Sequence, residues 1–132
     1  MILPQGATVA VVDGEKLVMF RSTGHDGVGL TALPHPQIDG EGAASLGHRS
    51  SAANPDNDTQ AEDGFAGGVA AMLNKQALEG EFDKLLVIAA PRTLGELRKH
   101  WHKALEGKLI GEIAKDLTGQ STAHIARAIE AA

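Results

Sequence analysis

One stretch of the chain, Lys84-Leu85-Leu86-Val87-Ile88-Ala89-Ala90-Pro91, decides the fold class. After Lys84 every residue up to Pro91 is apolar, with no alternation between apolar and polar positions. Strands that are covered by helices on both faces have this pattern, because both rows of their side chains are buried. Pro91 has no backbone N–H to donate, so it ends the strand. The stretch therefore predicts a central parallel strand from Lys84 to Ala90, and with it an α/β domain.

Three strands are expected before this stretch, and together they predict an antiparallel meander. Ala7–Val12 is apolar and rich in β-branched residues, and Asp13-Gly14 after it is typical of a tight hairpin turn. The second strand is expected over Lys16–Ser22 and the third over Gly29–Leu33, with a turn at 24–27 between them. The second strand has Leu17, Met19 and Arg21 on one face and Val18 and Phe20 on the other.

A helix is predicted between the meander and the central strand. Thr59-Gln60-Ala61-Glu62 has the spacing of a capping box, which marks a helix start, and Gly80 is expected to end the helix. Its apolar stripe is Phe65, Val69, Met72, Leu73 and Ala77.

Three more elements are predicted after Pro91. Thr93-Leu94-Gly95-Glu96 is a second capping box, and Gly107 ends the helix that it starts. Lys108–Asp116 is expected to be a strand, because a helix–strand–helix order completes the sheet. A last helix starts at Ser121. The apolar stripes of the two helices are Leu94, Leu97, Trp101 and Leu105, and then Ile125, Ala128 and Ile129.

The predicted element order is β-β-β-α-β-α-β-α. It gives a five-stranded mixed sheet of order 3-2-1-4-5 with helices on its faces, the ribonuclease H-like arrangement. The length of 132 residues predicts a single domain over 1–132. The segment at about 34–58 is rich in Pro, Gly, Ser and Asn and shows no strand or helix periodicity, so it is expected to be a long flexible loop.

The composition of the chain excludes several classes of site and argues against others. The chain has no cysteine, which removes disulfides, thiolate metal sites and thiol nucleophiles. Its 12 Lys and Arg against 17 Asp and Glu give a net charge of −5, which argues against coating nucleic acid by charge alone. The start of the chain has no basic segment before an apolar one, so no signal peptide is expected, and no apolar run could span a membrane. We expect a cytoplasmic protein.

The strongest candidate site is Pro91-Arg92-Thr93-Leu94-Gly95, where the central strand ends and a helix begins. Ligands of open α/β sheets bind at this edge, and helix N-termini favour anions. Arg92 and Arg98 would add bidentate contacts to a phosphate or carboxylate, with Thr93 and Gly95 beside them. The alternative is that Thr93 and Glu96 already satisfy the first N–H groups and that the arginines are solvated.

Catalytic and metal sites have less support. A nuclease of this fold would need clustered carboxylates, and Asp13 follows the first strand as a first ligand would. The central strand ends in Ala89-Ala90-Pro91, without a second carboxylate, and Asp before Gly is explained by the turn. The six histidines form no metal-binding motif; they are His25, His35, His48, His100, His102 and His124. We predict no catalytic residue, metal or cofactor.

Several stretches taken together resemble the bacterial host-attachment protein family. They are Val9 to Gly14, Met19-Phe20-Arg21, Phe82 with Leu85 to Arg92, Leu94 to Arg98, and Glu112 to Thr118. The resemblance covers nearly the whole chain outside the 34–58 loop, and it marks Asp13, Arg21, Pro91 and Asp116 as family-motif positions.

The family is similar in fold to the middle domain of the archaeal and eukaryotic class-one release factor and of Pelota. That resemblance implies a ribonuclease H-like domain. The release factor places a Gly-Gly-Gln tip in the peptidyl-transferase centre, and this sequence has no such triplet. Peptidyl-tRNA hydrolysis is therefore not expected.

Our leading hypothesis is a non-enzymatic binding module with an anion-favouring site at Arg92, Thr93, Gly95 and Arg98. One alternative is a module that associates with the ribosome or RNA without hydrolysis, and another is a metal-dependent nuclease. A direct role in host attachment fits poorly with the absence of a secretion signal, an anchor and disulfides.

Overall fold

A computed structural model describes residues 3–23, 29–34 and 57–132, with the backbone alone over 57–63. The predicted turn at 24–27 and most of the predicted loop at 34–58, with His25, His35 and His48, lie outside the described residues. In chain order the elements are β1 (Thr8–Val12), β2 (Leu17–Ser22), β3 (Leu30–Leu33), α2 (Asn57–Leu78), β4 (Leu85–Ala89), α3 (Pro91–Arg98), α4 (Lys103–Glu106), β5 (Leu109–Ala114) and α5 (Thr122–Ala131).

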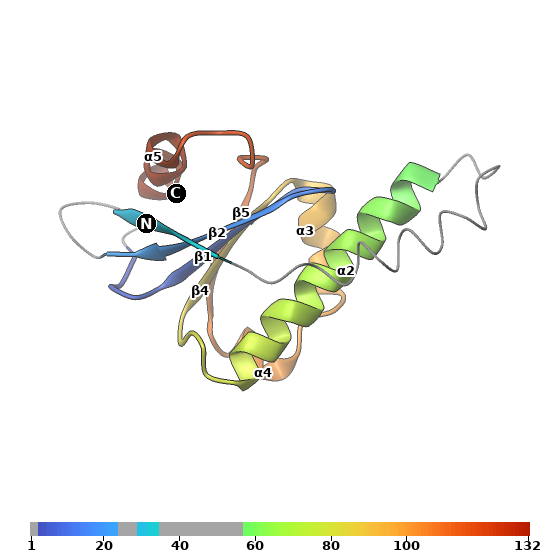
Figure 1. Ribbon diagram of the computed structural model, residues 1–132, viewed down its shortest axis with the longest axis horizontal. Helices are drawn as coiled ribbons and strands as arrows, with labels where there is room; N and C mark the ends of the chain where they lie inside the picture. Colours follow the sequence, from blue (N-terminus) through green and yellow to red (C-terminus); the bar gives the residue numbers. More distant parts are fainter. Residues whose placement is uncertain (1–2, 24–28, 35–56) are drawn as a thin grey trace.

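The five strands form one mixed sheet in the order β3-β2-β1-β4-β5, as the sequence predicts (Figure 1). The strands β1, β4 and β5 are parallel, and β2 runs antiparallel to both of its neighbours. The apolar stretch before Pro91 forms β4, which lies between β1 and β5. All five residues of β4 are buried. The prediction of a central parallel strand is confirmed.

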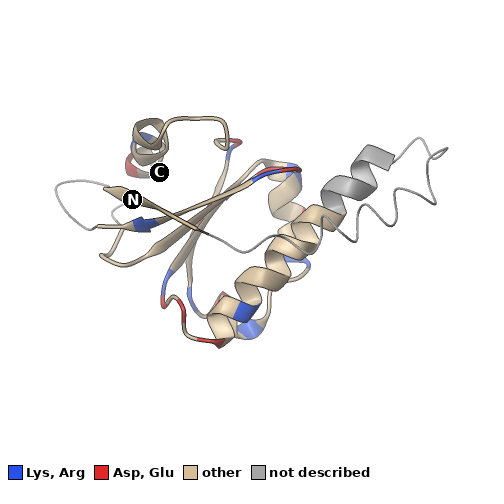
Figure 2. Cartoon of the chain, in the orientation of Figure 1, with Lys and Arg blue, Asp and Glu red and all other residues tan. Residues whose placement is uncertain are grey.

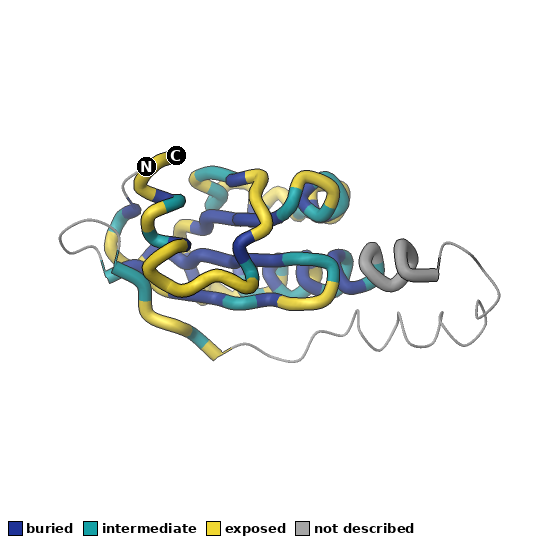
Figure 3. Tube along the Cα trace, turned by 90° about the horizontal axis from the view of Figure 1, so that it is seen from above, coloured by how far each residue is buried: buried dark blue, intermediate teal, exposed yellow. Residues whose placement is uncertain are grey.

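Helices cover both faces of the sheet (Figures 1 and 3). The face under α2 and α3 is built from alternate strand residues such as Ala10, Met19 and Val87. The opposite face carries Val9, Phe20 and Ile88, which pack against α5. The predicted split of β2 between Leu17 with Met19 and Val18 with Phe20 is confirmed. Alternation of this kind follows from the two-residue period of a strand.

The end of α2 follows the prediction at Gly80. Gly80 has a φ of 74°, which glycine adopts without strain, and its N–H donates to the Ala77 carbonyl. The N–H of Glu81 donates to the Gln76 carbonyl, which completes a Schellman motif. The Lys108 ammonium adds bonds to the Ala77 carbonyl at 2.8 Å and the Phe82 carbonyl at 3.0 Å. The start of α2 is Asn57, two residues before the predicted capping box.

The helix predicted after Pro91 is divided in two, so that prediction is wrong. The first part, α3, ends at Arg98, and the short α4 begins at Lys103. The link between them is held by Asn74 of α2, whose Nδ2 donates to the His100 carbonyl and whose Oδ1 accepts from the His102 N–H, both at 2.8 Å. The stripe of Leu94, Leu97, Trp101 and Leu105 has helical spacing, but these tertiary bonds replace helical ones.

Charged side chains lie mainly at the turns and ends of elements (Figure 2). Within the described ranges, no helix combines the length and the apolar content that a membrane crossing requires. The two central strands, β1 and β4, consist entirely of buried residues, so residues that could meet a ligand lie beyond the ends of these strands.

Candidate functional site

The parallel strands bring three separate chain segments to one edge of the sheet. Val12 of β1 pairs with Ala89 of β4, which pairs with Ala114 of β5. The chain therefore leaves these strands side by side, toward Asp13, Pro91 and Asp116. We call this the carboxyl edge. It brings together Asp13, Pro91, Arg92, Thr93 and Asp116 from the predicted set, whereas Arg21 pairs with Thr8 at the opposite end of the sheet.

Asp13 joins two parts of the carboxyl edge. Its Oδ1 accepts from the Glu15 N–H at 2.6 Å and the Lys16 N–H at 2.5 Å, which shapes the β1–β2 turn. Its Oδ2 accepts from the Thr118 hydroxyl at 2.6 Å. Partial burial raises the pKa of Asp13, but the bonds from Thr118, Glu15 and Lys16 outweigh that effect and leave the pKa below its ordinary value. The carboxylate is thus ionised at neutral pH, and both of its oxygens accept hydrogen bonds from within the fold.

Thr118 links the two predicted motif acids. Its hydroxyl lies 2.6 Å from Asp13 Oδ2 and 3.0 Å from Asp116 Oδ1. A hydroxyl has one proton to donate, so the shorter contact to Asp13 is the stronger hydrogen bond. The Thr118 N–H also approaches Asp116 Oδ1, at 3.4 Å. The segment after β5 is therefore fastened to the segment after β1, across the end of β4.

The start of α3 differs from the predicted capping box. Ala90 is the N-cap residue, and its methyl side chain cannot accept a hydrogen bond from the helix N–H groups. The Glu96 carboxylate instead binds Lys99 and approaches His100, so the alternative in which Thr93 and Glu96 cap the first N–H groups is wrong. Pro91 occupies the first turn, where its missing N–H costs nothing. The positive end of the α3 dipole therefore lies at the carboxyl edge, beside the exposed Arg92.

Arg98 takes part in a different interaction from the one predicted. Its Nε and Nη2 donate to Oε1 of Glu112 on β5, at 3.0 and 2.8 Å. This bonding raises the pKa of Arg98. The arginine side chain is 57% exposed and the Glu112 side chain 19% exposed, so water weakens the pair. Arg98 lies in the last turn of α3 and ties this helix to the edge strand, whereas Arg92 lies in the first turn, at the carboxyl edge.

Comparison with known proteins gives the family of the chain. A model of the family described as bacterial archaeo-eukaryotic release factor family 12 matches residues 6–129. The chain belongs to this family. The predicted relation to archaeal and eukaryotic release factors is confirmed at this level. The comparison with curated proteins finds no match.

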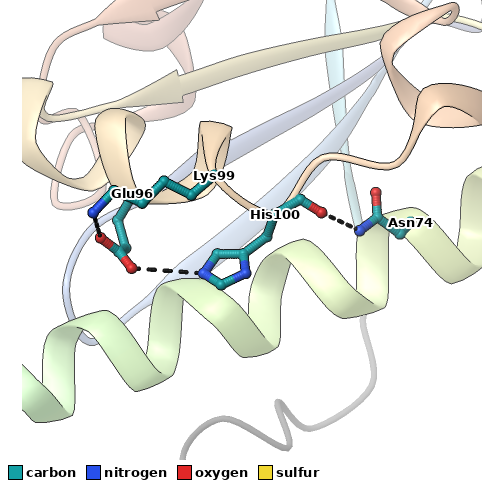
Figure 4. Close-up of polar contacts among 4 residues, drawn as sticks. All are labelled: Asn74, Glu96, Lys99 and His100. Carbon is teal, nitrogen blue, oxygen red and sulfur yellow. Dashed lines mark hydrogen bonds and ion pairs between the residues drawn. The ribbon is translucent and has the colours of Figure 1, made fainter.

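In this family member, a polar cluster holds the link after α3 (Figure 4). Glu96 lies 2.9 Å from Lys99 Nζ and 3.6 Å from His100 Nε2, while Asn74 holds the His100 carbonyl. The hydrogen bond from Lys99 is the main cause that lowers the pKa of Glu96. A Cβ on Gly67 would lie 3.7 Å from His100 Nε2, so this glycine faces the link. The cluster positions α3 against α2. It thereby fixes the position of the α3 N-terminus at the carboxyl edge.

Two of the described histidines, His100 and His102, take part in contacts at the link between α3 and α4. His102 is the N-cap of α4, and its Nδ1 accepts from the Ala104 N–H at 3.0 Å. Over the described part of the chain, no group of three or more His, Cys, Asp or Glu side chains could hold a metal ion.

Sequence reasoning missed Thr118, Glu112 and Asn74. Thr118 stood within the Glu112 to Thr118 stretch that carries the family resemblance, so a signal was present, but its partner Asp13 is 105 positions away. Glu112 belongs to the same stretch, but its pairing with Arg98 on another element is not visible there. Asn74 gives no signal, because it acts on a segment that is distant in sequence.

Proposed function

We propose that this domain is a non-hydrolytic binding module that associates with the ribosome, and that the start of α3 contacts a phosphate group of ribosomal RNA. The observation that carries the proposal is the match of residues 6–129 to a release-factor family. Release factors act on ribosomes, and the chain lacks the Gly-Gly-Gln triplet that the hydrolytic members use. Binding without peptidyl-tRNA hydrolysis is the activity that agrees with both facts.

The site assigned to this contact is Arg92, Thr93 and Gly95 at the carboxyl edge. The N-cap of α3 is an alanine, which cannot cap with its side chain, so the first N–H groups and the dipole of the helix favour an anion there. Arg92 is exposed on the first turn and supplies positive charge. A Cβ on Gly95 would meet no described atom within 4 Å, so the surface there is open. Arg98 is left out of the proposed contact, because it lies in the last turn of α3, away from the helix start, and binds Glu112 of β5.

The nuclease alternative has no comparable support. Asp13, the carboxylate on which it depended, accepts three hydrogen bonds that hold the turn and the segment after β5. We also infer that the fold is ribonuclease H-like and that the protein works in the cytoplasm, where ribosomes are. A connection with host attachment would then be indirect.

Co-sedimentation with purified bacterial 70S ribosomes tests the proposal. We expect the chain to pellet with ribosomes at low salt and to be released as salt is added, since phosphate contacts exchange with counterions. Arg92→Ala is expected to weaken binding about threefold or more. Arg127→Ala on α5 is the matched control, because Arg127 is exposed on the other face of the sheet. No pelleting at low salt, or equal losses for the two variants, would contradict the proposal.

Inorganic phosphate gives a second test that needs no ribosome. A ligand that binds the folded state alone raises the Tm. Phosphate is therefore expected to raise the Tm of the wild-type chain and to raise that of Arg92→Ala less, with matched chloride concentrations as the control. A flat titration for the wild type would count against the anion site.

A further inference from the structure

A hollow surrounds Arg21 at the end of the sheet opposite the carboxyl edge. Arg21 pairs with Thr8, where β1 begins and β2 nears its end. Two adjoining spaces of about 300 and 320 Å³ share Arg21, Glu81 and Phe82 in their walls. The first is also lined by Thr8, Met19, Leu33, Pro34 and Gln76. We call this first space the Arg21 hollow.

Two glycine turns shape this end of the molecule. Gly6, with a φ of 84°, precedes β1, and Gly80, with a φ of 74°, ends α2. Both conformations suit glycine, so the chain turns sharply before it enters β1 and after it leaves α2. The segment from Gly80 to Lys84 then lines the second space. The hollow thus lies between the last turn of α2 and the strands β1 and β2.

Thr8 supplies a buried polar group that has no partner among the described residues. The residue is 1% exposed, and its Oγ1 has no hydrogen-bond partner among the described residues. Burying a hydroxyl without a hydrogen bond costs free energy, so such atoms are rare in folded proteins. Because Thr8 lines the Arg21 hollow, an oxygen of a bound molecule would give this hydroxyl a partner.

Arg21 supplies the charge at the same place. Its side chain is exposed, and within the described part of the chain Nη2 donates one long hydrogen bond, 3.4 Å, to the Glu81 carbonyl. A guanidinium has five N–H donors in a planar arrangement that matches the two oxygens of a carboxylate. The Arg21 hollow is therefore lined by both a buried hydroxyl, that of Thr8, and a positively charged guanidinium, that of Arg21.

The remaining walls decide what kind of molecule fits. Met19, Leu33 and Phe82 form an apolar side that suits an aliphatic or aromatic body. Glu81 also lines the hollow, and its negative charge disfavours multiply charged anions relative to a single carboxylate. A volume of about 300 Å³ is at the low end for ligand sites, so the molecule must be small.

We propose that the Arg21 hollow binds a small monocarboxylate with an apolar body, its carboxylate on Arg21 and the Thr8 hydroxyl and its body against Met19, Leu33 and Phe82. This site is separate from the contact that we propose at α3. It also gives a role to Arg21, which the sequence marked as a motif position and the carboxyl edge does not use.

The test is a ¹H–¹⁵N NMR titration of the full chain with sodium benzoate, with benzamide as the neutral analogue. Benzoate is expected to shift the amide signals of Thr8, Arg21 and Phe82 along saturating curves, and benzamide is expected to shift them much less. Arg21→Gln removes the charge and should weaken benzoate binding about tenfold. Arg127→Gln is the matched control and should leave it unchanged.

A second variant tests the hydroxyl. Thr8→Val keeps the shape of the side chain and removes the polar atom, so the fold should persist while benzoate binds about threefold or more weakly. The proposal is overturned if benzoate gives no saturating shifts at these amides, if benzamide gives equal ones, or if Arg21→Gln and Thr8→Val both bind like the wild type.

Discussion

Asp13 is a single side chain that joins two segments far apart in sequence. Its Oδ1 holds the β1–β2 turn through Glu15 and Lys16, and its Oδ2 holds Thr118, 105 positions away. Because its folded-state pKa is lowered, its contribution to stability is present above the ordinary value of 3.8 and is lost as the pH falls through the folded-state pKa.

We expect Asp13→Ala to lower the free energy of unfolding by about 1 to 2 kcal/mol at neutral pH, through the loss of these hydrogen bonds. The difference from the wild type should shrink as the pH falls below 3.8, because the unfolded chain then binds a proton at Asp13 before the folded chain does. Urea unfolding at several pH values measures this. Glu15→Ala, at an exposed neighbour, is the control and should change little. A difference that stays constant down to pH 3 would contradict the account.

A substitution at Thr8 is expected to stabilise the fold, unlike the one at Asp13. Since its buried Oγ1 has no partner among the described residues, Thr8→Val should raise the free energy of unfolding by about 1 kcal/mol. Thermal and urea unfolding without added carboxylate check it. Thr31→Val on the exposed edge strand β3 is the control, with an expected change below about 0.5 kcal/mol. Loss of stability in Thr8→Val would show that this reading of the hydroxyl is wrong.

Among the elements, the link between α3 and α4 depends on one side chain of α2. Asn74 both donates to the His100 carbonyl and accepts from the His102 N–H (Figure 4 shows the first contact). Asn74→Ala removes both bonds and leaves these backbone groups without a protein partner. We expect the free energy of unfolding to fall by about 2 kcal/mol and the His102 amide to exchange faster with solvent.

Urea unfolding and hydrogen exchange measure the two effects of Asn74→Ala. Lys75→Ala, at the next position of α2, is the matched control, because Lys75 is exposed. Equal exchange of the His102 amide in Asn74→Ala and in the wild type would contradict the role that we give to Asn74.

The strands were predictable and the helix after Pro91 was not, for a physical reason. The apolar run of β4 and the alternation of β2 are local patterns, so the burial of each strand can be inferred from its own residues. The stripe from Leu94 to Leu105 is local as well, but the helix is interrupted by bonds from Asn74, which lies on another element. Tertiary contacts of this kind leave no periodic mark in the sequence.

At the scale of the whole molecule, the sheet order follows from the pattern of elements, and it places the ends of β1, β4 and β5 together. The position of the candidate site could therefore be predicted, but its pairings could not. The sequence predicts that Arg98 binds a phosphate or carboxylate, whereas in the structure it pairs with Glu112 of β5. Likewise, nothing local to Thr8 or Arg21 indicates that they share a hollow.

The central claim is that the chain binds ribosomes through the start of α3, and the salt dependence of the equilibrium constant tests it most directly. The logarithm of the binding constant for 70S ribosomes, measured with fluorescently labelled chain, should fall linearly with the logarithm of KCl concentration. Arg92→Ala should reduce the steepness of that line by about one unit, and Arg127→Ala should not. Binding that does not depend on salt, or a slope that is the same in Arg92→Ala, would contradict the claim.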